Sequence, residues 1–257
     1  MLFLPEQAES VQPGLEKIDT YLTLSKLGCP VFKSALIKSD EPIENETICA
    51  LQSYFKTKEV TVRYQYVRSS IHPVQGGNRY QLSLEAIAPL QNADTYLWLL
   101  EPIDRLKNEY GINLRFQSDQ CCIEMVGRGF DVSDLNRGQI SPHQTIITEL
   151  PVRMGAYNEW WKFLKYSFAT QEEYLLSIAR RMEKLTSMGY TASRQIFCPQ
   201  YKPLPIERLE TLLGYITRIS VHVDQDDFCV SASISDHHFI FWDIQTPAGK
   251  KRTYGVK

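Results

Sequence analysis

The stretch GINLRFQSDQCCIEMV, residues 111–126, alternates apolar and polar side chains in each of its two halves. Such alternation sends successive side chains to opposite faces of an extended chain and is typical of β-strands. We therefore expect residues 111–116 and 121–126 to be the two strands of a β-hairpin. This hairpin lies near the middle of the chain and sets the expectation of a sheet around it.

Similar patterns predict further strands on both sides of the hairpin. Residues 60–69 alternate valine and tyrosine with polar side chains, and residues 96–100 are almost wholly apolar. The stretch 218–245 reads as three consecutive strands joined by acidic turns. The predicted strands fall within residues 29–40, 60–69, 81–87, 96–100, 111–116, 121–126 and 218–245.

Helical spacing of apolar residues occurs in several separate segments. In residues 172–187 the stripe consists of Leu175, Ile178, Met182 and Leu185, and Gly189 follows as a stop signal. The predicted helices are residues 13–27, 45–54, 159–168, 172–187 and 206–214. Strands and helices in this order indicate an α+β protein. We expect two lobes: residues 1–95, with a basic strand and a Gly-rich loop, and residues 96–257, with a long loop, a helical insert and terminal antiparallel strands.

Composition narrows the functional classes. The 257 residues carry a formal net charge of -2, which provides no field to attract nucleic acid or an anionic membrane. We see neither a signal-peptide core nor an apolar run long enough to span a bilayer. Six cysteines form no CxxC pair, so reduced thiols in the cytoplasm are the expectation.

A first group of candidate residues is basic. Lys33 lies in a predicted strand, Arg63 and Arg68 lie in another, and a Gly76-Gly77 loop follows. Cations with directional donors beside small residues suit a polyphosphate. The same charges are also typical of strand ends on a solvated surface, and composition alone does not separate the two interpretations.

A second group lies in the long loop 127–143 and beside it. Glu124, Arg128, Asp131, Asp134 and Arg137 bring acid and arginine together, which suits a metal or an anionic substrate. Asp and Ser also cap turns, and Arg also pairs with Asp. Both interpretations stay open, although a loop of this length favours a function.

A third group lies near the C-terminal end of the chain. His222, Asp224, His237 and His238 are residue types that bind transition metals, but they fall where turns are predicted. Asp243 differs, because it follows FIFW inside an apolar strand, where an acid needs a charged or metal partner. A metal-dependent hydrolase is one hypothesis for this group.

The order of segments resembles the ATP-grasp nucleotide-binding domains. The stretch KIDTYLTLSKLGCPVFKSALI (17–37), a helix and VTVRYQYVRSS (60–70) look like the opening of these domains. The resemblance is closest to phosphoenolpyruvate synthase and pyruvate phosphate dikinase. TYLWLLEP (95–102) resembles the hinge strand that receives adenine, and FIFWDIQTP (239–247) is similar to the terminal strand whose acid and amide ligate magnesium.

This resemblance implies two-lobed mixed sheets with flanking helices, and ATP and Mg²⁺ as cofactors. Lys33 and Arg68 would contact phosphates, Glu101 would lie at the adenine hinge, and Asp243 with Gln245 would hold the metal. Arg128 and Arg137 would anchor a small anionic substrate, so that Arg68, Arg128 and Arg137 form the expected catalytic set.

The chain departs from the family at the metal site. Ser231 and Ser233 stand where an earlier acid is usual, and the terminal pair is Asp and Gln rather than Glu and Asn. Two functions follow: a Mg-dependent ligase or phosphotransferase, or a catalytically degenerate nucleotide-binding regulatory or interaction protein. The residues leave open whether the chain forms a homo-oligomer or needs a partner subunit.

Overall fold

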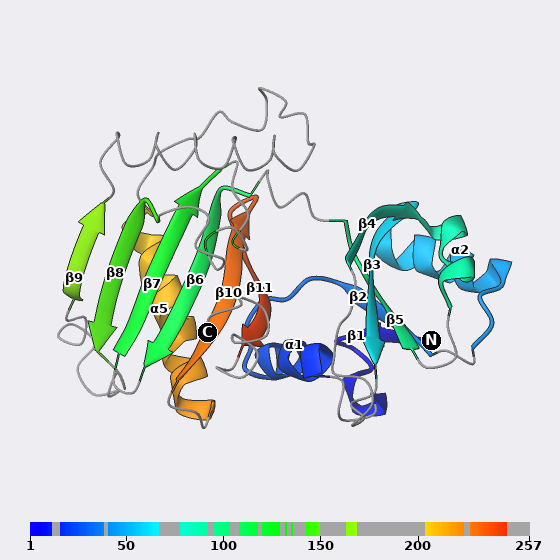
Figure 1. Cartoon of the computed structure of the whole chain (residues 1–257), viewed down its shortest axis with the longest axis horizontal. Coiled ribbons are helices and arrows are strands. Elements are labelled where there is room, and N and C mark those ends of the chain that lie inside the picture. The colour runs from blue at the N-terminus through cyan, green and yellow to red at the C-terminus, as the bar shows by residue number, and fades with distance from the viewer. Residues whose placement is uncertain are drawn as a thin grey trace, which may run out of the picture. The chain divides into compact units, whose positions relative to one another are not determined.

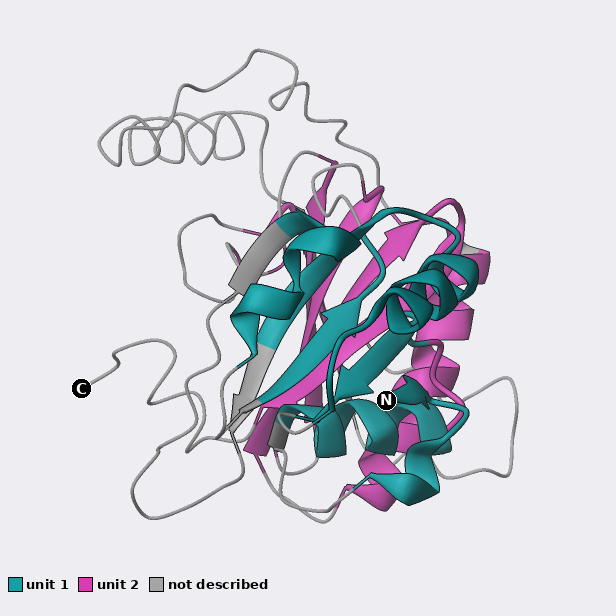
Figure 2. Cartoon of the chain, turned by 90° about the vertical axis from the view of Figure 1, so that its right-hand side faces the viewer, with its two compact units in different colours: residues 1–26, 31–103 teal, residues 27–30, 104–257 magenta. Residues whose placement is uncertain are grey.

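The computed structural model describes two compact units, each built around one antiparallel sheet (Figures 1 and 2). The first unit comprises residues 1–26 and 31–103, and the second comprises residues 27–30 and 104–257. The structure describes residues 1–11, 16–38, 41–66, 78–91, 95–102, 108–117, 120–128, 132, 135, 142–149, 163–168, 204–223 and 227–245.

The sheet of the first unit has the strand order β1-β2-β5-β3-β4. Its strands are β1 (Leu2–Leu4), β2 (Ser34–Ile37), β3 (Glu59–Tyr66), β4 (Asn78–Ser83) and β5 (Thr95–Leu100). The helices of this unit are α1 (Glu16–Lys26), α2 (Asn45–Phe55) and the 3₁₀ turns η1 (Ala8–Ser10), η2 (Leu84–Ala86) and η3 (Ala88–Leu90).

Alternation along β5 gives the first sheet two different buried faces. Leu97 and Leu99 face a core that also contains Leu51 and Phe55 of α2. The intervening Trp98 turns to the other face, where its ring lies 5.6 Å from that of Tyr21 in α1. The helices α1 and α2 therefore cover opposite faces of this sheet.

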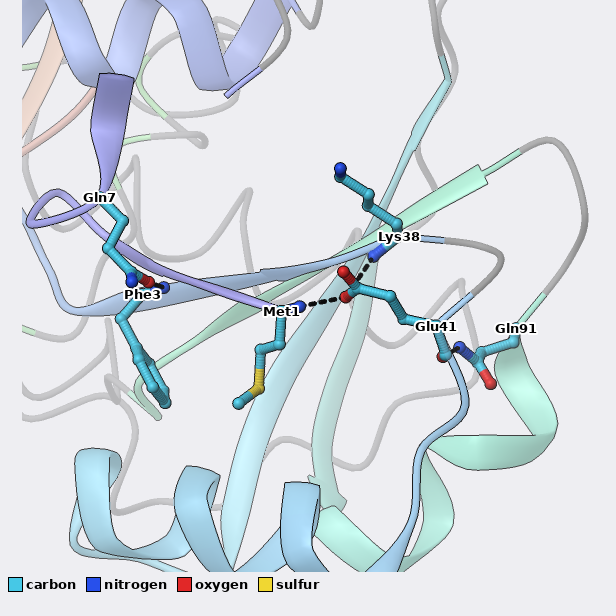
Figure 3. Close-up of polar contacts among 6 residues, drawn as sticks. All are labelled: Met1, Phe3, Gln7, Lys38, Glu41 and Gln91. Carbon is cyan, nitrogen blue, oxygen red and sulfur yellow. Dashed lines mark hydrogen bonds and ion pairs between the residues drawn. The ribbon is translucent and has the colours of Figure 1, made fainter. Parts of the chain in front are cut away.

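Glu41, which follows β2, joins three segments of the first unit (Figure 3). The Met1 amino group contacts its carboxylate. Its Oε2 accepts the backbone N–H of Lys38 at 3.5 Å, and its carbonyl oxygen accepts Nε2 of Gln91 at 2.5 Å. These contacts attach β1 and the segment after η3 to the end of β2.

The sheet of the second unit has the strand order β11-β10-β6-β7-β8-β9. Its strands are β6 (Tyr110–Gln117), β7 (Gln120–Gly127), β8 (Gln144–Glu149), β9 (Phe163–Phe168), β10 (Asp227–Ser235) and β11 (His238–Gln245). The helix α5 (Ile206–His222) packs on one face, where the ring of Tyr215 lies 5.7 Å from Phe239 and 5.1 Å from Phe241.

The predicted α+β class is confirmed, as are the hairpin of β6 and β7 and the helices α1 and α2. All described strand pairs are antiparallel, where we expected mixed sheets. The first compact unit extends to residue 103, because β5 pairs with both β2 and β3. No helix in the described ranges is both long enough and apolar enough to span a bilayer.

Three predicted elements were wrong. Residues 163–168 form strand β9, which pairs with β8, where we expected a helix. Residues 218–222 continue α5, because the apolar stripe of Leu209, Leu212, Ile216 and Ile219 extends its helical face. The strand predicted for 81–87 ends at Ser83 and gives way to η2.

Candidate functional site

One face of the second sheet carries a line of polar side chains across four neighbouring strands. Asp243 on β11 lies opposite Ser231 on β10, Ser231 lies opposite Asn113 on β6, and Asn113 lies opposite Glu124 on β7. We call these four residues the polar row. In β6, β7 and β10 the residues next to these in the strand point to the face that α5 covers, because side chains alternate along a strand.

A bulge in β11 brings Trp242 and Asp243 to this face together. The pairing of β10 with β11 shifts between Ser231 and Ala232, so that Trp242 is the extra residue. Its indole Nε1–H donates to Ser233 Oγ at 3.0 Å. This contact places Trp242 on the side of the serines and beside the start of the polar row.

Asp243 and Gln245 lie on the same face of β11, as the predicted pair requires. Asp243 is 8% exposed, and Gln245 Nε2 donates to its Oδ1 at 3.4 Å and its Oδ2 at 3.2 Å. The carboxylate of Asp243 is therefore buried, and its two hydrogen bonds with the Gln245 amide fix the orientation of both side chains.

Glu124 organises the other end of the polar row. Its Oε2 accepts Asn113 Nδ2 at 2.9 Å and Arg115 Nη2 at 3.3 Å. Burial opposes the charge on Arg115, but the carboxylate of Glu124 together with Cys229 and Cys122 outweighs burial and raises the pKa of the guanidinium. Arg115 is thus a fixed cation on the same face.

The side chains on this face are of the kinds that could hold the magnesium that the resemblance implies. The same face carries two carboxylates, Asp243 and Glu124, and Glu124 pairs with the guanidinium of Arg115. Magnesium is commonly held by one or two carboxylates together with waters and phosphate oxygens. Asp243 with the side-chain oxygen of Gln245 is compatible with such a site.

Among the described residues, no group of three or more His, Cys, Asp or Glu side chains is placed to hold a metal ion. His222 lies in the last turn of α5, and its ring contacts the Arg218 carbonyl at 2.8 Å. His237 contacts Glu109 and Arg208 instead. Asp224 lies outside the described residues, and the described histidines give the metal-dependent hydrolase no support.

Lys33 and Glu101, both predicted to contact the nucleotide, are neighbours in the first unit. The Lys33 N–H donates to Glu101 Oε1 at 2.9 Å, and the Glu101 N–H donates to the Lys33 carbonyl at 3.0 Å. Lys33 Nζ lies 5.5 Å from the ring centre of Tyr54. The two residues extend the pairing of β2 with β5 by one step.

The predicted arginines are described only in part. Arg128 is exposed, directly after β7. Arg68 and Arg137, together with most of the loop 127–143 and the Gly76-Gly77 loop, lie outside the described residues. Within the long loop, Val132 and Leu135 are buried. A methyl group added to Gly111 would meet the Val132 nitrogen at 3.1 Å, which places Val132 against β6.

Our sequence analysis missed Asn113 and Arg115 as site residues. Both occupy polar positions of the alternation that predicted β6, so a signal was present. Polar side chains on one face of a strand usually face water, however, and the burial of Asn113 at 2% exposed depends on the folded sheet.

A scan against protein families matches none, and a search of curated proteins returns no match. Among solved structures, D-alanyl-alanine synthetase A from Vibrio cholerae aligns at 11% identity and TM-score 0.46, over 91% of this chain and 55% of that one. D-alanine–D-alanine ligase from Bacillus anthracis complexed with ATP aligns at 10% identity and TM-score 0.43, over 91% and 56%. Macrocyclase MdnC from Microcystis aeruginosa, bound to precursor peptide MdnA, aligns at 9% identity and TM-score 0.42, over 93% and 59%.

The chain thus spans just over half the length of each of these proteins. At TM-scores below 0.5 the likeness carries no assignment of function. It also gives no support to the narrower resemblance to phosphoenolpyruvate synthase and pyruvate phosphate dikinase.

Proposed function

We propose that this chain is an ATP-binding protein of the ATP-grasp type and acts as a magnesium-dependent ligase or phosphotransferase on a small anionic substrate. The observation that carries the proposal is the polar row. A buried carboxylate, Asp243, lies beside the amide of Gln245 on a sheet face that also carries the fixed cation of Arg115.

Each predicted residue has a role in this proposal. Asp243 and Gln245 would hold Mg²⁺, which would neutralise charge on the phosphates of ATP. Lys33 and Arg68 would contact those phosphates, and Glu101 would lie at the adenine hinge. Arg128 and Arg137 would hold the anionic substrate.

In the ligase form of the reaction, an oxygen of the substrate carboxylate bonds to the γ-phosphorus while the bond to the ADP oxygen breaks. The negative charge that spreads over the transferred group requires cations rather than a protein nucleophile. This requirement agrees with the residues proposed here, which are cations and metal ligands.

The test is a thermal-shift titration of the purified protein with ATP, ADP and GTP, each with and without Mg²⁺. We expect stabilisation by adenine nucleotides that Mg²⁺ increases, of about 2.7 kcal/mol at 100 times the dissociation constant. Arg68→Ala should weaken this shift. The absence of a shift with every nucleotide at millimolar concentration would overturn the proposal.

A second candidate function is a nucleotide-binding module without catalysis. It is favoured by Ser231, a neutral residue that lies opposite Asp243 where the family commonly has a second acid. This candidate predicts the same thermal shift but no ADP release with any carboxylate acceptor. Magnesium-dependent ADP release would rule out this candidate and support the ligase or phosphotransferase.

A further inference from the structure

Asn113 carries a buried polar atom that has no partner within the described part of the chain. The side chain is 2% exposed, and its Nδ2 donates to Glu124 Oε2 at 2.9 Å. Its Oδ1 accepts no hydrogen bond from any described residue. A buried acceptor left unsatisfied destabilises the folded state, so the site calls for a donor that the described residues do not supply.

Glu124 determines which way the amide of Asn113 points. A rotated amide would bring Oδ1 against the Glu124 carboxylate, and two acceptors would then face one another. The observed orientation therefore directs Nδ2 toward β7. The strand on the other side of β6 from β7 is β10.

On that side the next residues of the polar row are Ser231 and then Asp243. Two strand spacings separate the Cα atoms of Asn113 and Asp243 by about 10 Å. The serine between them is small and carries no charge. A cation at Asp243 that kept its coordinated waters would present water donors toward Asn113.

We propose that Asn113 is a positioning residue for a hydrated divalent cation at Asp243 and that its Oδ1 accepts a hydrogen bond from a water bound to that cation. This inference rests on the proposed function, which assigns the cation to Asp243. The missing acid of β10 is then replaced by an amide one strand further along the sheet, and Glu124 holds that amide in position.

The amide suits this role for an electrostatic reason. Glu124 and Arg115 already form an ion pair at 3.3 Å, and the neutral Asn113 adds an acceptor without adding charge. Magnesium loses its waters reluctantly, so an acceptor for coordinated water contributes to its binding. Residues that hold a metal through such contacts commonly change its affinity by about 10- to 100-fold.

The experiment measures Mn²⁺ affinity by electron paramagnetic resonance, with and without ATP, in the full chain. Asn113→Leu keeps a similar volume and removes the acceptor, and we expect Mn²⁺ binding to weaken about tenfold or more. Asn113→Asp retains an acceptor but sets a second carboxylate against Glu124, so Mn²⁺ affinity should fall less than in Asn113→Leu. Melting curves of both variants establish that they fold.

The matched control is Asn108→Leu. Asn108 is also buried, at 3% exposed, and its Oδ1 also has no partner among the described residues, but it precedes β6 and lies outside the polar row. Its substitution should leave Mn²⁺ affinity unchanged. An equal loss in both variants would mean that a general change in the fold, not the cation contact, is responsible.

The outcomes separate this inference from the proposed function. If Asp243→Asn abolishes Mn²⁺ binding while Asn113→Leu binds Mn²⁺ as tightly as the unchanged protein, the inference fails and the proposed function stands. If the unchanged protein binds no Mn²⁺ even with ATP, the proposed cation site at Asp243 is ruled out, and the inference about Asn113 is ruled out with it.

Discussion

Gln245 donates its side-chain amide to both carboxylate oxygens of Asp243, at 3.4 and 3.2 Å, along one face of strand β11. The two residues are separated by one position, so alternation alone brings them to the same face. The bulge at Trp242 then decides that this face is the one that carries Ser231, Asn113 and Glu124.

We predict that Asp243→Asn removes the part of the ATP-induced thermal shift that depends on Mg²⁺. The substitution preserves size and an oxygen acceptor for Gln245, but it deletes the negative charge that would hold the cation. The measurement is the difference in melting temperature with ATP in the presence and absence of Mg²⁺. Asp236→Asn is the control, because Asp236 is an exposed turn acid with φ 47, a conformation that Asn tolerates. A full magnesium effect in the Asp243 variant would rule out the predicted ligand.

We predict opposite stability changes for two glycine substitutions. In Gly111→Ala the new methyl would meet Val126 Cγ2 at 3.0 Å and the Val132 nitrogen at 3.1 Å. Overpacking of this kind costs about 1–3 kcal/mol. Gly214→Ala lies in α5 with nothing within 4 Å of the new methyl, so we expect a gain of about 0.5–1 kcal/mol. Urea unfolding measures both, and a stable Gly111→Ala protein would mean that Val132 does not pack on β6.

We predict that Glu109 contributes stability that is lost in acid. Burial opposes its charge, but the hydrogen bond from the His237 N–H, together with the hydrogen bond and charge of Arg208, outweighs burial and lowers its pKa. A carboxyl with a lower pKa in the folded state stabilises the protein above its unfolded pKa, near 4.5, and loses this effect as the pH falls through the folded value.

The measurement for Glu109 is the free energy of unfolding at a series of pH values between about 7 and 3, a range that spans the usual glutamate pKa. Glu109→Gln should reduce stability at neutral pH and flatten the decline in acid. Glu210→Gln, an exposed position on α5, is the control and should leave the profile unchanged. Parallel profiles for the Glu109 variant and the unchanged protein would contradict the prediction.

We predict that the cysteines react with iodoacetamide in an order set by burial. Cys49 is exposed on α2, whereas burial raises the pKa of Cys29 to about 11 and that of Cys121 well above its usual range. Alkylation requires the thiolate, so at pH 8 Cys49 should react first and the buried pair only after unfolding. Mass spectrometry of timed samples gives the order, and early labelling of Cys121 would show that β7 opens readily.

The local patterns predicted elements whose period was long and regular. The helix of residues 45–54 and the hairpin of 111–126 appear within one or two residues of their predicted bounds. The error at 218–222 arose because a short run such as ISVHV fits a strand, while the longer stripe that begins at Leu209 fits a helix. Length decides between the two, since a helix gains one hydrogen bond for each residue added.

The candidate site was only partly visible in the same patterns. Asp243 stood out as an acid in an apolar strand, and Gln245 followed from the family resemblance. Asn113 and Arg115 occupy the polar positions of an alternating strand, and such positions usually face solvent. Glu124 was considered only with the loop that follows it.

Periodicity along the chain therefore determined strands such as β3, β6 and β7 and which face of each is apolar, because side chains alternate with a fixed period. The tertiary structure alone decided that β10 lies between β6 and β11 and that Asp243, Ser231, Asn113 and Glu124 share one line. That alignment depends on hydrogen bonds between strands more than 100 residues apart in the chain, such as β6 and β10. A local pattern contains no information about which distant strand will be the neighbour, and this is the physical reason why the site appears only in the folded chain.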